Sequence, residues 1–466
     1  MSTTPMPGPL WLSEIASLPP LGSPLDGDVR ADIAIMGGGF VGLWTAIHLK
    51  EKQPDLQVVL LEQDRIGHGA SGRNGGFVMS WWPKIASLVA IAGESDGLWL
   101  ADQTTANIGE MADFLRDQQV DAEFVTGGWL WAATSPAHFG AWKDVLETAR
   151  RLGRPEVFRE VDAPELAKRT GSPRHLKGIY EAKNGNVHPA KLVYGLGTIA
   201  KRLGVRLCEG ARVDRIDNGP PVRLHTPNGI VEAPKLVMAT NAWARKLPEI
   251  HKRVICVSSA IVATKPIPDE IEKLGWTGGE TITDSQSTLD YYRTTRSGRI
   301  VFGKGWAGLQ YGRSVPPGVF SDDAGIAAAK ADFNRMYPQL ADVPIDYGWS
   351  GPIDRTHDGL PIIGTLDAAR HISFGVGWSG NGVGPSRLGG RMLASLALGI
   401  RNRWTENKFV NRAATAFPPE PIRYWIGTTV RNAVWRKDRA EIAGRTPRAI
   451  DRVLAGLAPA GTEDKR

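Results

Sequence analysis

A glycine-rich turn between an apolar strand and an apolar helix constrains the fold of this 466-residue chain more than any other feature. An apolar run over residues 33–36 ends in three consecutive glycines, and the residues after them are apolar at helical spacing, with no charge until Lys50. In this context Gly37-x-Gly39-x-x-Gly42 predicts a dinucleotide-binding strand–turn–helix unit. Gly37 permits the tight turn, Gly39 lets a pyrophosphate approach the backbone, and Gly42 lets the helix pack on the strand.

The surroundings of this turn predict which part of a ligand lies against it. The amino end of the following helix offers free N–H groups and a partial positive charge, which suit a diphosphate. Glu62 ends the next apolar run twenty positions after Gly42, where a carboxylate accepts the hydroxyls of an adenosine ribose. We therefore predict a dinucleotide with AMP at one end. NAD and FAD share this pattern, so it does not choose between them.

The rest of the chain alternates between two kinds of segment. Residues 31–115, 166–243 and 346–400 contain strand–helix units, which predict a discontinuous Rossmann-like domain of the α/β class. Residues 116–165 and 244–345 alternate apolar and polar residues at short period, which predicts an antiparallel sheet in a second, α+β domain for the substrate. The chain is thus expected to cross repeatedly between an FAD- or NAD-binding domain and a substrate domain.

Both ends of the chain differ from this body. Residues 1–30 are rich in Pro and Gly and predict an N-terminal arm. Residues 401–466 hold 14 Lys and Arg against 7 Asp and Glu, so they account for the whole net charge of +7. Their apolar residues from Ile422 to Val434 fall on one face of a basic amphipathic helix. We expect this helical extension to dock on the protein's own body, with a partner or a membrane surface as the alternative.

Composition excludes several classes of protein. The two cysteines, Cys208 and Cys256, form no CxxC motif, so neither a disulfide framework nor a metal site is predicted. No segment approaches 18 consecutive apolar residues, and no apolar stretch follows a basic amino terminus, so we expect a cytoplasmic protein without a transmembrane helix. Nucleic acid is not an expected partner, because the arginines of the extension flank an apolar face and form no continuous stripe.

A second glycine-rich loop, "ASGRNGG" at residues 70–76, lies where a bulky ligand would extend past the pyrophosphate. Three further motifs follow the two glycine-rich segments: "VMATNAW", "WSGPIDRTHDGLPIIG" and "GVGWSGNGVGPSRLGG". These five motifs, in this order over about residues 30–400, resemble the D-amino-acid-oxidase-like FAD oxidoreductases, which include glycine, sarcosine and γ-glutamylputrescine oxidases. The amino-terminal "GPLWLSEIASLPPLGSPL" and the second loop favour the γ-glutamylputrescine oxidase branch.

The resemblance implies FAD as the cofactor and gives it a set of contacts. Ser71 is expected at the pyrophosphate and the backbone of Val213 at the adenine. The turn before residue 385 is expected at the flavin N1 and C2 carbonyl, where a helix dipole stabilises the negative charge of the reduced ring. The expected FAD-binding residues are Gly37, Gly38, Gly39, Phe40, Val41, Gly42, Glu62, Gln63, Ser71, Gly72, Arg73, Asn74, Gly75, Gly76, Val213, Ala239, Thr240, Asn241, Trp243, Gly351, Gly380, Asn381, Gly382 and Val383.

Two departures from the family pattern bear on the substrate and on the attachment of the flavin. Gly384 stands where sarcosine-type members keep a lysine that grips the substrate carboxylate, which disfavours a simple α-amino acid. No cysteine lies near Gly351, where some relatives attach the flavin, and His68 is displaced by one residue from the histidine that others use. We therefore predict non-covalent FAD, with a link to His68 as the alternative.

The resemblance implies oxidation of the C–N bond of a small amine, primary or N-substituted, with or without a distal anionic group. The product imine hydrolyses to an aldehyde and ammonia or an amine, and O2 takes the electrons to give H2O2; a dehydrogenase that passes them to a quinone or carrier is the alternative. Lys304 is the candidate charge for oxygen reduction, and Asn74 the second catalytic candidate. Tyr292, Trp306, Arg355 and Trp378 are expected in the substrate pocket, with Tyr291 beside them and Arg73 and Arg293 as further anion-binding candidates.

Overall fold

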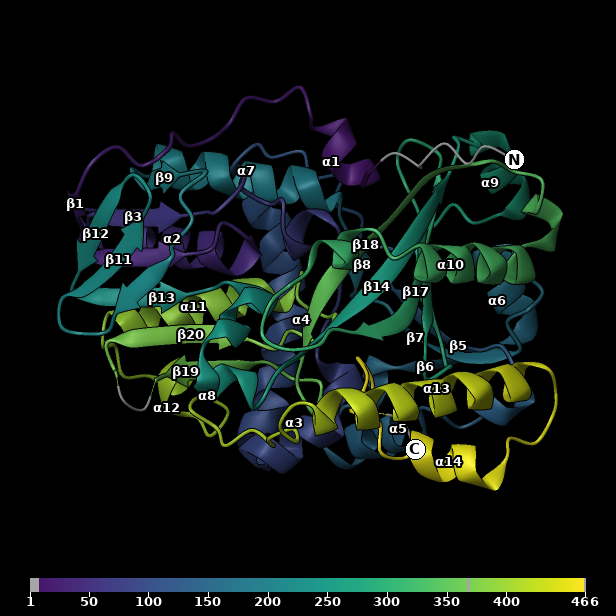
Figure 1. The fold of residues 1–466 in the computed structure, drawn as a ribbon. Helices are drawn as coiled ribbons and strands as arrows, with labels where there is room; N and C mark the ends of the chain where they lie inside the picture. The colour runs from purple at the N-terminus through teal and green to yellow at the C-terminus, as the bar shows by residue number, and fades with distance from the viewer. Residues whose placement is uncertain (1–7, 367–368, 465–466) are drawn as a thin grey trace.

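The computed structural model describes residues 8–366 and 369–464, and the side chain of Trp306 lies outside the described part. Figure 1 shows a smaller sheet at the left and a larger sheet at the right, with the long yellow helix of the carboxyl-terminal extension below the larger one. The predicted α/β class with an antiparallel second sheet is confirmed. The chain passes between the two sheets several times, as the alternation of segments predicts.

The smaller sheet has six strands in the order β19-β20-β13-β2-β3-β9, and all neighbouring pairs except β19–β20 are parallel. Its central strands are apolar runs because both faces are covered. Helices α2 (Phe40–Lys52), α7 (Pro189–Arg202) and α11 (Pro385–Ala397) pack together on one face. The strands are β2 (Ile33–Met36), β3 (Val58–Leu61), β9 (Arg206–Cys208), β13 (Lys235–Met238), β19 (Ile362–Thr365) and β20 (Ile372–Val376).

A four-stranded sheet in the order β1-β12-β11-β10 covers the other face of the smaller sheet. Strands β11 and β12 form an antiparallel hairpin across the turn at Asn228-Gly229. The strands are β1 (Val29–Arg30), β10 (Arg215–Asp217), β11 (Val222–Thr226) and β12 (Gly229–Ala233).

The larger sheet has eight strands in the order β18-β14-β17-β16-β15-β5-β7-β6, and only its β15–β5 pair is parallel. Helix α10 (Asp323–Met336) packs on one face, so the opposite face is left to border a cavity. The strands are β5 (Trp129–Ala133), β6 (Arg159–Asp162), β7 (Lys177–Glu181), β14 (Ile255–Thr264), β15 (Thr281–Asp284), β16 (Asp290–Thr294), β17 (Ile300–Leu309) and β18 (Ile345–Arg355).

Sheet membership differs from two of the predicted domain boundaries. Strand β7 lies within 166–243, and β18 occupies the start of 346–400, yet both belong to the larger sheet and not to the smaller one. The physical reason is that β7 pairs with β5 and β18 pairs with β14 over ten residues, partners that local pattern does not reveal. The carboxyl end of β18 thereby reaches the smaller sheet and joins the two halves.

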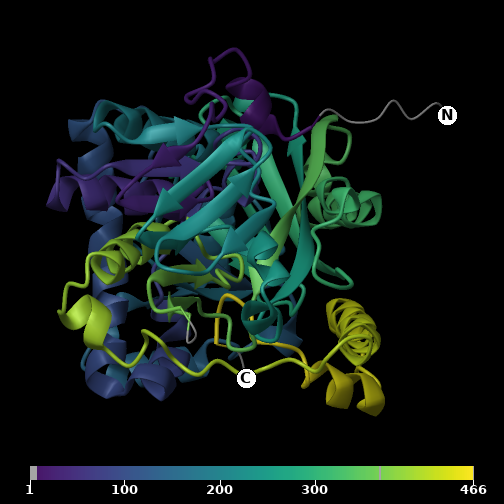
Figure 2. The same ribbon diagram turned by 60° about the vertical axis from the view of Figure 1, so that its left-hand side comes forward.

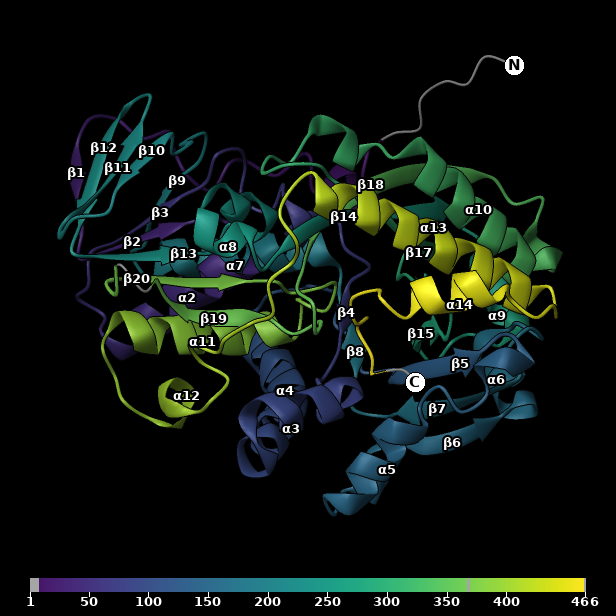
Figure 3. The same cartoon turned by 60° about the horizontal axis from the view of Figure 1, so that its bottom comes forward.

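Several helices and two short strands connect the sheets. In Figure 3, α3 and α4 lie below the junction and α5 beside the larger sheet. These connecting elements are α3 (Ile85–Ala92), α4 (Glu94–Asp117), α5 (Lys143–Arg151), α6 (Ala163–Thr170), α8 (Pro248–His251), α9 (Pro268–Leu274), β4 (Phe77–Val78) and β8 (Gly185–Asn186). Among the described residues, no helix is both long and apolar enough to cross a membrane.

The carboxyl-terminal extension contains α12 (Arg403–Glu406), α13 (Ile422–Ile442) and α14 (Ala449–Ala455). Figure 2 shows α13 and α14, in yellow, side by side at the edge of the molecule. Asp438 of α13 accepts hydrogen bonds from the N–H and hydroxyl of Thr288, which hold the helix against the larger sheet. Val430 and Val434 are buried, whereas Trp425 is 66% exposed, so only part of the predicted apolar face is covered.

The amino-terminal arm is tied to the second glycine-rich loop. Its helix α1 (Leu10–Glu14) buries Trp11, whose indole Nε1 donates a hydrogen bond of 2.8 Å to the carbonyl of Asn74. The same ring lies under the guanidinium of Arg293, at 4.9 Å from its centroid. The arm therefore supports a loop of the candidate site.

Candidate cofactor and substrate site

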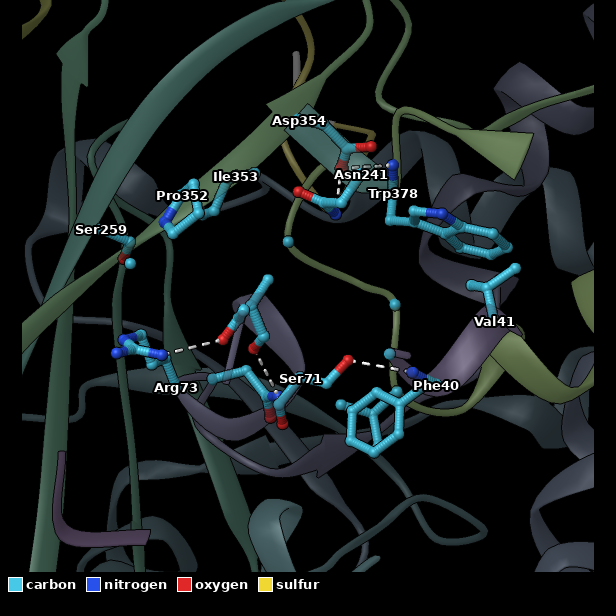
Figure 4. A pocket seen from close by; sticks show the side chains of 18 of the residues that line it. Phe40, Val41, Ser71, Arg73, Asn241, Ser259, Pro352, Ile353, Asp354 and Trp378 are labelled. Carbon is cyan, nitrogen blue, oxygen red and sulfur yellow. Dashed lines mark hydrogen bonds between the residues drawn. The ribbon is translucent and has the colours of Figure 1, made fainter. Parts of the chain in front are cut away.

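An elongated cavity of about 730 Å³ lies between the two sheets. One end lies at the carboxyl ends of β2, β3 and β13, which is where open parallel sheets bind nucleotides. The other end lies against the face of the larger sheet that α10 leaves free, and it is lined by Ser259, Tyr291 and Gly305. Figure 4 shows Ser71 and Phe40 toward one side of this cavity and Arg73 and Ser259 toward the other.

Backbone packing at the first turn admits glycine only. Gly37 has φ of +109°, and a Cβ built on it would lie 2.5 Å from the carbonyl oxygen of Ala239. A Cβ on Gly42 would lie 2.0 Å from the carbonyl oxygen of Gly37. Helix α2 therefore begins directly against the strand, and its amino end opens into the cavity. This arrangement can hold a diphosphate on backbone N–H groups.

Glu62 lies at the end of β3, half-buried, with its carboxylate at the cavity. Its two oxygens accept hydrogen bonds from the N–H groups of Gly38, at 2.8 Å, and Asp64, at 3.0 Å. Burial raises the pKa of this carboxyl group, and the bonds from the backbone partly oppose that rise. Val213 and Ala211 line the cavity nearby, as expected for an adenosine site.

The second glycine-rich loop is held in place by its own polar side chains. The hydroxyl of Ser71 accepts a hydrogen bond of 3.0 Å from the N–H of Phe40, which joins this loop to the start of α2. The amide of Asn74 donates to the carbonyl of Ser71 at 2.8 Å and accepts from the N–H of Gly76 at 2.8 Å. These bonds of Asn74 hold the loop in shape, and its catalytic role stays a prediction.

Asp354, which the sequence analysis did not single out, joins three parts of the site. Its carboxylate accepts hydrogen bonds from the N–H groups of Gly377 (2.6 Å) and Trp378 (3.0 Å) and from the side chain of Asn241 (2.9 Å). Figure 4 shows Asp354, Asn241 and Trp378 close together at one side of the cavity. Burial raises the pKa of Asp354 to about 7, against the opposing effect of these bonds. The carboxylate thus fixes β18, the turn after β20 and the segment after β13 together.

The residues present fit an FAD molecule. Among the described residues, the hydroxyl of Thr240 and the amide oxygen of Asn381 are buried without a hydrogen-bond partner, and both residues line the cavity. Buried polar atoms are normally paired, so these two atoms suit a polar ligand. They lie respectively beside the expected pyrophosphate and flavin positions, and together with the first turn and Glu62 they make a continuous site for a flavin dinucleotide.

Most of the predicted cofactor residues line this cavity. Four predicted glycines, Gly38, Gly42, Gly72 and Gly76, do not line it. The last three let neighbouring backbone pack closely behind the cavity, and Gly38 leaves room for the side chains of Ile66 and Glu62. The predicted residues that line it are Gly37, Gly39, Phe40, Val41, Glu62, Gln63, Ser71, Arg73, Asn74, Gly75, Val213, Ala239, Thr240, Asn241, Trp243, Gly351, Gly380, Asn381, Gly382 and Val383.

Lys304 does not reach the cavity, which contradicts its predicted role in oxygen reduction. Its buried Nζ lies 2.9 Å from carboxylate oxygens of both Asp290 and Asp332, on the face of the larger sheet covered by α10. Successive side chains of a strand point to opposite faces, and Lys304 shares the α10 side with Phe302. The neighbouring Gly305 lines the cavity instead.

The same alternation corrects one of the predicted substrate residues. Tyr292 is buried on the α10 side, where its hydroxyl bonds to His175, whereas Tyr291 lines the cavity. Trp378 and Arg355 line the cavity as predicted. The backbone of Trp306 lies in β17, but its side chain is outside the described residues.

The arginines expected to bind an anionic group are engaged with the protein itself. Nη1 of Arg73 donates to the carbonyl groups of His68 and Gly69, whereas its Nε is buried without a hydrogen-bond partner among the described residues; the guanidinium lies 4.7 Å from the ring centroid of Phe320. Arg293 is buried and bonded to main-chain carbonyls, including that of Gly75 at 2.8 Å. Arg355 binds the carbonyls of residues 459 and 460.

Several lining residues carry no sequence signal. Ser259 and Phe320 come from segments without a motif, and Gly461 and Thr462 come from the far end of the described chain. Only the strand alternation around Tyr291 could have indicated which side chains of the larger sheet face the cavity.

Comparisons with known proteins agree with this geometry. A family model described as FAD dependent oxidoreductase matches residues 32–396. Gamma-glutamylputrescine oxidoreductase from Escherichia coli (strain K12) is 28% identical over 400 residues, which cover 84% of this chain and 89% of the relative. Probable oxidoreductase OrdL from Rhizobium meliloti (strain 1021) is 30% identical over 415 residues, with 84% and 89% covered. The crystal structure of glycine oxidase from Geobacillus kaustophilus shares the fold, with a TM-score of 0.64 at 22% identity over 80% of this chain and 96% of that one.

Proposed function

The chain belongs to the FAD dependent oxidoreductase family, and from that premise we propose that it oxidises the C–N bond of a small amine without an α-carboxylate. The family match confirms the predicted resemblance and FAD as the cofactor. The relative named gamma-glutamylputrescine oxidoreductase supports an amine as the substrate. The reaction breaks an α C–H bond, moves its electron pair to the cofactor and forms a C=N bond, which water then hydrolyses.

The observations that carry this proposal concern Gly384, which directly follows the lining residue Val383, and Arg73, which lines the cavity. A Cβ on Gly384 would lie 2.8 Å from the carbonyl oxygen of Met79, so this position has no room for the carboxylate-binding lysine of sarcosine-type members. Arg73 is already bonded to main-chain carbonyls. A carboxylate on the reacting carbon would therefore find no lysine after Val383, and Nη1 of Arg73 would not be free to bind it.

Tyr291 and Ser259 form the polar part of the proposed substrate end. The hydroxyl of Ser259 donates to the carbonyl of Lys304 at 3.0 Å, so the hydroxyl of Tyr291, 2.8 Å away, must donate to Ser259. The phenol oxygen keeps a lone pair that can accept an N–H of the amine. Burial raises the pKa of Tyr291, so this group orients the amine and does not take its proton.

The amine is expected to react in its neutral form. Among the described residues that line the cavity, the acidic ones are Glu62, Asp64 and Asp354, and the last is fully occupied by its hydrogen bonds. None is left to act as a base at the end near Tyr291. FAD supplies the two-electron oxidation when it is bound. The buried, partly aromatic surroundings favour the uncharged amine by desolvation.

The electron acceptor that we propose is O2, with release of H2O2. A fixed positive charge near the flavin favours reduction of oxygen, and Arg73 takes the role that the sequence analysis gave to Lys304. Burial lowers the pKa of Arg73, but an arginine stays charged at neutral pH.

We expect anaerobic addition of putrescine, another diamine or an N-methylated amine to bleach the visible absorption band of the purified flavoprotein. The panel also contains γ-glutamylputrescine, aminophosphonates and α-amino acids, so the substrate class is read directly from which compound reduces the cofactor. Bleaching by α-amino acids alone would contradict the proposal. The same substrate in air should yield peroxide; rapid dye reduction with slow peroxide formation would instead identify a dehydrogenase.

We expect FAD to leave the protein on acid precipitation, because we propose a non-covalent cofactor. His68 lines the cavity and its Nδ1 lies 3.8 Å from a carboxylate oxygen of Asp64. The measurement is the fraction of flavin absorbance in the supernatant, expected to be nearly complete for the native chain and for His68→Ala. Yellow colour that stays in the native pellet and disappears from the His68→Ala pellet would establish a covalent link.

A further inference from the structure

A segment outside the matched family region forms part of the cavity wall. After α14 the chain turns inward, and Gly461 and Thr462 line the cavity. Figure 3 shows this stretch, in yellow, running from α14 toward β4 and β8. The family model ends at residue 396, so residues 459–464 lie outside the region that matches the family. We call residues 459–464 the return segment.

The return segment is fixed at its far end by a buried ion pair. The carboxylate of Asp464 lies 2.7 Å from Nζ of Lys84, whose side chain is 2% exposed. The same carboxylate accepts hydrogen bonds from the hydroxyl of Ser87 at 2.6 Å and from its N–H at 3.0 Å. The N–H of Asp464 donates to the carbonyl of Pro83 at 2.7 Å. These contacts give the segment one defined position on the start of α3.

The segment also packs on two glycine turns of the flavin end. A Cβ on Gly359 would lie 2.4 Å from the carbonyl oxygen of Gly461. A Cβ on Gly380, in the turn expected at the flavin N1 and C2 carbonyl, would lie 3.6 Å from Cγ2 of Thr462. The N–H of Ala460 donates to the carbonyl of His357 at 2.9 Å. The return segment therefore packs directly against the backbone of both glycine turns.

The return segment also occupies the guanidinium of Arg355. Nη2 of Arg355 donates to the carbonyls of Pro459 at 3.0 Å and Ala460 at 2.6 Å, and Nε donates to the carbonyl of Ala460 at 3.2 Å. Glu463 is 1% exposed and accepts a hydrogen bond of 3.2 Å from Thr283, a residue of the cavity wall. Burial lowers the pKa of Arg355, and the charge of Glu463 opposes that shift.

We propose that the return segment sets substrate specificity by occupying Arg355, and so excludes carboxylate-bearing ligands from this part of the cavity. A guanidinium in a partly dry cavity would otherwise bind a carboxylate by two parallel hydrogen bonds. The return segment instead pairs the guanidinium of Arg355 with two main-chain carbonyls. The carboxylate of Glu463 also repels an incoming anionic ligand. The inference rests on the proposed function of the cavity. In the native chain Arg355 holds the return segment in position through its bonds to the carbonyls of Pro459 and Ala460.

Reversing the charge at the anchor tests this proposal on the full chain. Asp464→Lys faces Lys84 with a like charge and should release the segment, whereas Asp464→Glu keeps a carboxylate and should retain it. Acetate, propionate and benzoate are titrated against the visible spectrum of the FAD-bound protein, with the corresponding amides as neutral controls. We expect at least tenfold tighter carboxylate binding by Asp464→Lys, with Asp464→Glu within threefold of the native chain and the amides unchanged.

Two further measurements assign the effect to its cause. The gain in carboxylate binding should vanish in Asp464→Lys/Arg355→Met, because the guanidinium is then absent. Hydrogen exchange of the amides of Ala460 and Asp464 should be slow in the native chain and fast in Asp464→Lys. Equal carboxylate affinity in native and Asp464→Lys protein, a gain that survives Arg355→Met, or unprotected amides in the native chain would each overturn the proposal. These readouts need bound FAD but no turnover, so they are independent of whether an amine is the substrate.

Discussion

Gly42→Val should leave the purified protein with less than a tenth of the FAD that the native chain carries. The Cβ of residue 42 would lie 2.0 Å from the carbonyl oxygen of Gly37, and backbone cannot yield as a flexible side chain can. Helix α2 must then move off β2, and its amino end no longer faces the diphosphate position. Overpacking of a buried contact costs about 1–3 kcal/mol even where side chains can adjust.

The measurement is the ratio of bound flavin to protein, followed by titration of the apoprotein with FAD. Gly109→Val is the matched control, because Gly109 lies in helix α4 and a Cβ there meets nothing within 4 Å. Gly42→Ala adds the same Cβ with less bulk, so it tests whether the FAD site can be lost while the protein still folds. Far-ultraviolet circular dichroism reports whether each variant folds. Native FAD content in a folded Gly42→Val protein would show that this turn does not hold the cofactor.

The cofactor half of the site could be predicted because its requirements are local. The turn from Gly37 to Gly42, the carboxylate of Glu62 and the loop around Ser71 each need particular residue types at fixed spacing, and all of them meet at one end of the smaller sheet. Asp354 escaped prediction because its role depends on three partners from distant segments. A buried carboxylate that joins such segments has no spacing of its own in the sequence.

The substrate half was predicted less well because strand register decides it. Tyr291 and Tyr292 are neighbours in sequence, and a shift of one residue exchanges which of them faces the cavity. The pairing of β16 with β17 places Asp290 opposite Lys304, so both side chains lie on the α10 face. The place of the return segment at the cavity could not be predicted for another reason. Its composition resembles an ordinary surface tail, and only the fold brings it back to Arg355.

Lys304→Met should destabilise the folded protein by about 3–5 kcal/mol, the usual cost of removing one member of a buried ion pair. The substitution leaves the carboxylates of Asp290 and Asp332 without their shared ammonium group, although Arg335 still contacts both. Burial, the largest effect, and the charge of Asp332 already hold the pKa of Asp290 well above its ordinary value. Without Lys304, Asp290 should take up a proton more readily, so the loss of stability should be smaller at pH 5 than at pH 8.

Chemical denaturation with saturating FAD measures this loss, and Lys330→Met on α10 is the control. Lys330 is exposed, so its replacement should change the free energy of unfolding by no more than about 0.5 kcal/mol. Adding Asp290→Asn to Lys304→Met should recover part of the stability, because one uncompensated charge is removed. The rate at which oxygen reoxidises the reduced flavoprotein should stay within twofold of native, since Lys304 lies on the far face of the sheet from the cavity. A tenfold slower reoxidation with unchanged stability would instead return Lys304 to the oxygen reaction and place its side chain on the cavity side of β17.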